Sequence, residues 1–72
     1  MTLQLAFALP TSTRSHLVAA ELKALGFVAS ADSAPVDGLG YIVDVLELHD
    51  GEVDDLLKVM ERHAPDSRRI DL

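Results

Sequence analysis

The residues best suited to chemistry gather near the starts of two predicted helices. The larger group is an acidic cluster beside His49, made of Asp50, Glu52, Asp54 and Asp55. A calcium loop needs ligands at alternate positions and a distal bidentate carboxylate, and Gly51 stands in the wrong place for that pattern. Carboxylates in a first helical turn are favoured by the helix dipole without a metal. We therefore expect no metal and no cofactor.

The smaller group combines hydroxyls with an imidazole: Ser12, Thr13, Ser15 and His16. Neighbouring residues on a helix point in different directions, so Ser15 and His16 do not form a nucleophile–base pair. The chain has no cysteine, which removes thiol nucleophiles and disulfides. Gly38 and Gly40 precede a predicted strand, whereas a phosphate-binding loop leads into a helix. These patterns predict a protein that is not an enzyme.

The charge balance indicates which partners suit this surface. Six Lys and Arg residues against twelve Asp and Glu residues give a formal net charge of -6. Nucleic-acid binding depends on cations that neutralise phosphates, and Arg68 with Arg69 is too small a basic patch for it. We therefore expect no direct contact with nucleic acid, and favour docking onto a protein with a basic surface.

The elements that position these residues belong to one small domain, residues 1–72. Alternation of large and small side chains predicts a half-buried strand that ends near Leu9. A helix over residues 14–25 follows, capped by the hydroxyls of residues 11–13 and ended by Gly26. Its buried stripe is predicted to contain Leu17, Val18, Leu22 and Leu25. The N-terminus has no basic segment and no apolar run long enough for a bilayer, so we expect a cytoplasmic protein without membrane contact.

The second half of the chain predicts a short strand over residues 27–31, a turn-rich segment, and a strand over residues 41–48. The strand over residues 41–48 does not have a single apolar face, because Val43 and Val45 share one face while Leu46 and Leu48 share the other. Either both faces are partly buried or a bulge near Val45 and Leu46 shifts the register. A helix capped by Asp50 and ending before residue 65 follows, and a short strand in residues 66–72 completes the chain.

The order β-α-β-β-α-β predicts an α+β, ferredoxin-like fold. Right-handed crossovers give a four-stranded antiparallel sheet of order 4-1-3-2 with two helices on one face. The opposite, open face carries small residues on the first strand and is the candidate interface. The predicted partner contacts are Ile42, Leu46 and Leu48. The residues predicted to steer a basic partner are Asp44, Glu47, Asp54 and Asp55.

Several segments resemble the regulator of ribonuclease activity B family. Residues 6–11 form an apolar strand running into a Leu-Pro-Thr turn, and residues 25–27 close a helix with Gly-Phe. Residues 41–45 match a Tyr-containing strand and residues 50–64 an acidic helix, in the same order as in the family. The likeness covers most of the chain and departs at residues 70–72. It implies a small acidic protein that binds and inhibits an RNA-degrading endonuclease.

Two function classes therefore stand side by side. The first is a non-enzymatic interaction module that regulates or inhibits an RNA-processing or other nucleic-acid enzyme. The second is a small-molecule-sensing homodimer with a pocket near the turn of residues 10–13. A homodimer through the sheet face or its edge is compatible with either class.

Overall fold

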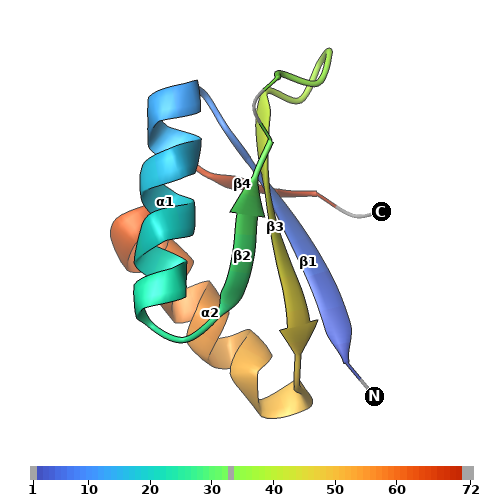
Figure 1. Ribbon diagram of the computed structural model, residues 1–72, viewed down its shortest axis with the longest axis vertical. Helices are drawn as coiled ribbons and strands as arrows, with labels where there is room; N and C mark the ends of the chain where they lie inside the picture. The colour runs from blue at the N-terminus through green and yellow to red at the C-terminus, as the bar shows by residue number, and fades with distance from the viewer. Residues whose placement is uncertain (1, 33, 71–72) are drawn as a thin grey trace.

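Figure 1 shows a computed structural model of the chain, in which residues 2–32 and 34–70 are described. The elements are β1 (Leu3–Leu9), α1 (Ser12–Ala24), β2 (Val28–Ala31), β3 (Tyr41–Leu48), α2 (Asp50–His63) and β4 (Arg68–Ile70). The predicted order of strands and helices is confirmed. The predicted last strand is present at residues 68–70, and its continuation through residues 71 and 72 lies outside the described residues.

The four strands form one sheet in the order β2-β3-β1-β4, with every neighbouring pair antiparallel. Counted from the β4 edge, this is the order 4-1-3-2. Both helices lie on the same side of the sheet, as Figure 1 shows. The chain is therefore an α+β protein in which two helices leave the opposite sheet face open.

The main core lies between the sheet and the helices. Phe7 and Leu9 of β1 and Val43 and Val45 of β3 are each at most 2% exposed. They belong to one apolar cluster with side chains of both helices, namely Val18, Ala19, Leu22, Leu56 and Met60. Alternation along the strands sends these side chains toward the helices and their neighbours toward the open face. The strand residues that alternate with these core residues therefore form the open face.

Helix α1 buries a narrower stripe than the sequence predicts. Its buried residues are small or β-branched as well as leucine: Ser15, Val18, Ala19 and Leu22. The prediction that Leu17 and Leu25 share this stripe is wrong, because they are 52% and 55% exposed. Leu17 lies about 100° around the helix from Val18, and Leu25 is the C-terminal cap, beyond the last helical turn.

Polar contacts set the ends of the helices. The Thr11 hydroxyl accepts the main-chain N–H of Arg14 at 3.2 Å and caps α1, as expected for this residue type. The prediction that Asp50 caps α2 is off by one position, because the cap is His49 and Asp50 is the first helical residue. The main-chain N–H of His49 donates to the Glu52 carboxylate at 3.2 Å. The acidic first turn therefore has a structural role in closing this helix end.

An arginine links two segments far apart in the sequence. Arg14 donates to both carboxylate oxygens of Asp66, at 3.2 and 3.0 Å, and to the His63 carbonyl at 3.0 Å. The hydrogen bond from Arg14 lowers the pKa of the Asp66 carboxyl. This bidentate contact joins the start of α1 to the connection between α2 and β4.

Candidate functional site

Strand β3 changes the direction of its side chains near its end. Leu5 pairs with Val45, but Leu3 pairs with Leu48, so one extra residue is inserted in β3. Glu47 in this segment has a φ of 54°, in the left-handed region. A bulge is one of the two alternatives that the sequence leaves open, and the strand pairing shows that it is present after Val45. Leu48 consequently faces the helices and is 1% exposed, so the prediction that it contacts a partner is wrong.

The open face has its own apolar cluster, separate from the main core. Ala6, Ala8 and Ile42 are 1%, 4% and 7% exposed, and Ile70 of β4 packs against them. Ile42 therefore lies on this face, and its role as a partner contact stays a prediction. Leu46, the second predicted contact, is half-buried on the same face. A sheet face of this kind presents a shallow apolar floor with no helix above it.

Strand pairing arranges the open face in rows that run across the sheet. In one row, Arg68 is paired with Ala8 and Ala8 with Ile42. The main-chain N–H of Asp32 donates to the Ile42 carbonyl at 3.0 Å and extends the row beyond the end of β2. Side chains of directly paired residues lie on the same face. From the β4 edge to the β2 edge, the row therefore consists of the cation of Arg68, the methyl group of Ala8, the side chain of Ile42 and the carboxylate of Asp32.

The next row places a carboxylate near the middle of the face. Asp44 is paired with Ala6 on one side and Ser30 on the other. Partial burial raises the pKa of the Asp44 carboxyl, and the negative charge of Asp32 raises it further, while a hydrogen bond from the Gln4 side chain opposes these effects. The electrostatic effect of Asp32 on Asp44 agrees with both carboxylates lying on this face.

The four residues predicted to steer a partner do not lie together. Asp44 lies on the open face, and Glu47 is exposed in the bulge that follows it. Asp54 and Asp55 are exposed on α2, which covers the opposite side of the sheet. Interactions between exposed charges fall off over about 10 Å at moderate salt. Asp44 and Glu47 are therefore the two members of this set that serve the open face directly.

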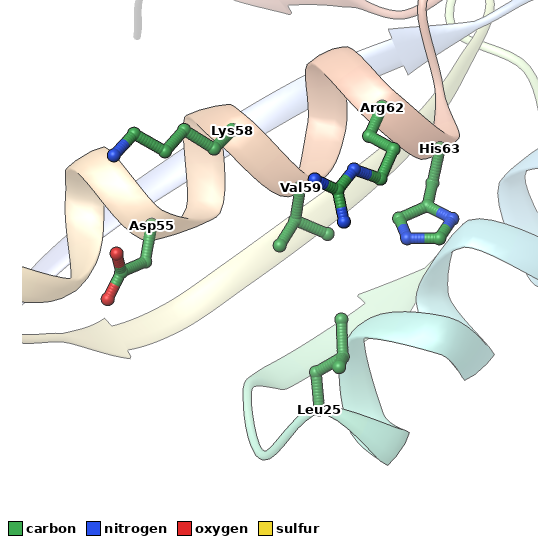
Figure 2. A pocket seen from close by; sticks show the side chains of 6 residues that line it. All are labelled: Leu25, Asp55, Lys58, Val59, Arg62 and His63. Carbon is green, nitrogen blue, oxygen red and sulfur yellow. The ribbon is translucent and has the colours of Figure 1, made fainter.

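Figure 2 shows where Asp55 lies instead, at a groove between α2 and the end of α1. The groove has a volume of about 320 Å³, and its apolar part comes from Leu25 and Val59. Its rim carries Lys58 and Arg62 as well as Asp55, so charges of both signs surround it. Nothing in this arrangement selects one class of ligand.

The closest approach to a nucleophile–base pair is Ser12 with His16. The Ser12 hydroxyl lies 3.4 Å from Nδ1 of His16, but that nitrogen also lies 2.8 Å from the Ser12 carbonyl oxygen. A carbonyl oxygen accepts a proton, so Nδ1 is the donor in the shorter contact. It then has no lone pair to accept the hydroxyl proton. The pair is a helix-terminal hydrogen bond and is not arranged for proton abstraction.

Three further features bear on function. Among residues 2–32 and 34–70, no group of three His, Cys, Asp or Glu side chains is placed to hold a metal ion. In the same part of the chain, neither helix is both long and apolar enough to cross a membrane. A cavity of about 230 Å³ lies beside the turn at Pro10, and Ala8, Leu39 and Arg68 contribute to its lining.

Some residues of the open face were not predicted from the sequence. Val28, which is 47% exposed, pairs with Leu46, and Asp32 and Arg68 occupy opposite edges of one row. Their positions follow from strand register, which sequence periodicity alone does not supply.

No family model matches the chain, and no match is found among curated proteins or solved structures. The function is therefore argued from the surfaces of the chain itself.

Proposed function

We propose that this protein is a small, non-enzymatic protein-interaction module that binds through its open sheet face. The observation that carries the proposal is the second apolar cluster, formed by Ala6, Ala8, Ile42 and Ile70 on the face without helices. A 72-residue chain gains stability mainly from apolar side chains enclosed in its core. Ala6, Ala8 and Ile42 are themselves nearly buried, so the apolar surface open to another protein comes from the half-buried Leu46 and the exposed Val28 on the same face.

Half-buried and exposed side chains complete this contact surface. Leu46 and Val28 form an apolar pair toward one end of the face, with Leu46 half-buried and Val28 exposed.

 Asp44 and Glu47 supply negative charge on and beside the face, which favours a partner with a basic surface. Charge of this kind raises the rate of association, while the apolar floor holds the partner in place.

The fold and the resemblance to a known family indicate what kind of partner this module binds. The order of elements and the order of strands support a ferredoxin-like fold as the finer assignment. The likeness to the regulator of ribonuclease activity B family supports a cytoplasmic regulator or inhibitor of an RNA-processing enzyme. In this reading the protein itself does not contact nucleic acid, in keeping with its net charge of -6.

The test compares two leucine variants in a pull-down from lysate of the source cells, with nuclease added. Leu46→Asp places a charge on the open face, and Leu17→Asp makes the same change at an exposed position on α1. We expect the wild type and Leu17→Asp to retain one stoichiometric protein and Leu46→Asp to lose it. Equal capture by both variants would contradict binding through the open face.

The cavity beside Pro10 supports a second candidate, a ligand-sensing homodimer. The cavity, about 230 Å³ in volume, lies at the turn where the sequence places a ligand pocket, and Arg68 lines it. A ligand that binds the folded state raises the melting temperature by mass action. A thermal-shift screen with amino acids and nucleotides tests this candidate, and a shift that Arg68→Ala abolishes would favour it over the interaction module.

A further inference from the structure

We propose that the open sheet face binds a second copy of this chain, through a two-fold axis that runs parallel to the strands between β1 and β3. The inference rests on the proposed function and names the partner of the same surface. The acidic side of this face, at Asp32, favours a partner with a basic surface. The chain itself has such a surface at the β4 edge, where Arg68 lies. The face is therefore complementary to its own rotated copy.

The row through Arg68, Ala8, Ile42 and Asp32 carries the argument. A rotation of 180° about an axis parallel to the strands brings the β4 edge of one copy over the β2 edge of the other. Arg68 then faces Asp32 of the partner subunit, and Asp32 faces Arg68 of the partner subunit. Between these charges, the small Ala8 side chain faces the larger Ile42 of the partner subunit. One row thus matches its copy in both charge and size.

Other arrangements do not produce this match. A two-fold axis across the strands places β2 over β2 and β4 over β4, so that charges of like sign lie on the same edge. Pairing through a sheet edge has little main chain to use, because β2 has four residues and β4 has three. The axis parallel to the strands is the arrangement that brings opposite charges together.

The size of the face predicts a weak dimer. The strands have 7, 4, 8 and 3 residues in chain order, and at a spacing of about 4.8 Å they cover roughly 350 Å² per copy, or roughly 700 Å² in total. This is below the range of standard stable interfaces. Asp44 faces Ala6 of the partner subunit and loses water without gaining a cation, which weakens binding further. We expect a dissociation constant of roughly 10 μM or weaker.

Sedimentation velocity over a wide range of concentrations tests the proposal with two charge-reversal variants. In Arg68→Asp, two carboxylates face each other at each contact, and in Asp32→Arg, two cations do. We expect each variant alone to dimerise roughly tenfold more weakly than the wild type, or worse. Mixed together, the two variants pair Asp with Arg at both contacts, and we expect the mixture to recover a heterodimer. Arg62→Asp and Asp54→Arg, on α2, make the same charge changes away from the face and serve as controls.

The outcomes separate this inference from the proposed function. Recovery in the mixture of open-face variants, without any change in the mixture of controls, supports the dimer. A wild type that stays monomeric at all concentrations, or a mixture that does not recover, overturns it. If Leu46→Asp still loses a captured protein in either of those cases, the interaction module stands with a different partner. If Leu46→Asp behaves like Leu17→Asp as well, both proposals fail.

Discussion

Two leucines near the end of β3 offer the sharpest test of how this sheet divides its side chains. Regular alternation places Leu46 and Leu48 on the same face, but the bulge sends Leu48 into the main core. Leu48 is 1% exposed, whereas Leu46 is half-buried. Truncating a buried leucine to alanine costs about 2–5 kcal/mol, through lost transfer energy and the cavity left behind. We therefore expect Leu48→Ala to cost about 3 kcal/mol and Leu46→Ala about 1 kcal/mol.

Urea denaturation followed by circular dichroism measures both costs. The protein is kept at low micromolar concentration, so that weak association through the open face does not contribute to the free energy of unfolding. In a thermal experiment, a chain of this size loses roughly 4–8 °C per kcal/mol, so the two variants differ by roughly 8–16 °C. If Leu48→Ala does not fold, Leu48→Met and Leu46→Met give a milder comparison.

Equal costs for the two alanine variants would refute the reasoning, because they would mean that both side chains have the same surroundings. A larger cost at Leu46 would show that the bulge lies elsewhere and that Leu48 belongs to the open face. The binding experiments are expected to give the reverse order, with Leu46→Ala weakening association and Leu48→Ala leaving it unchanged wherever the variant is folded.

Three further predictions concern stability. Gly40 has a φ of +106°, and an added Cβ would lie 2.7 Å from a main-chain oxygen of β1, so Gly40→Ala should cost about 1 kcal/mol or more beyond Gly38→Ala, which has open space at a φ of +78°. Burial raises the pKa of Asp44, so its ionisation lowers stability as the pH rises through that pKa. Asp44→Asn should therefore stabilise the protein slightly at neutral pH, and the gain should vanish in acid. Hydrogen bonding to Arg14 lowers the pKa of Asp66, so its contribution is lost as the pH falls through that pKa, and Arg14→Ala should remove this part of the acid dependence in urea titrations.

The order of elements could be predicted because each one has a local cause in the sequence. Alternation marks β1, the Thr11 hydroxyl caps α1, and the positive φ of +99° at Gly26 follows its end. These signals depend on residues close together in the chain. The bulge could be predicted as one of two alternatives, because the phase of residues 41–48 breaks near Leu46.

The face of the sheet on which a side chain lies could not be predicted from the sequence alone, because it depends on strand pairing. Regular alternation predicts that Leu48 shares the open face with Leu46, and the one residue inserted in β3 reverses this. Leu25 was assigned to the core because it lies one turn beyond Leu22, but it lies past the end of the helix. Arg68 and Asp32 are 36 positions apart by residue number and meet in one row through the pairing of three strands.

The bulge at Glu47 also determines which surface can bind. By turning Leu48 inward, it gives the main core a buried leucine beside α2 and leaves Leu46 as the last large side chain of β3 on the open face. A residue other than glycine in the left-handed region costs about 1–2 kcal/mol, so the conformation of Glu47 persists because burial of Leu48 more than offsets that cost. The same local feature therefore stabilises the core and limits the open face to a small apolar floor. A surface so limited suits reversible contact, in which charge at the two edges selects the partner and its orientation.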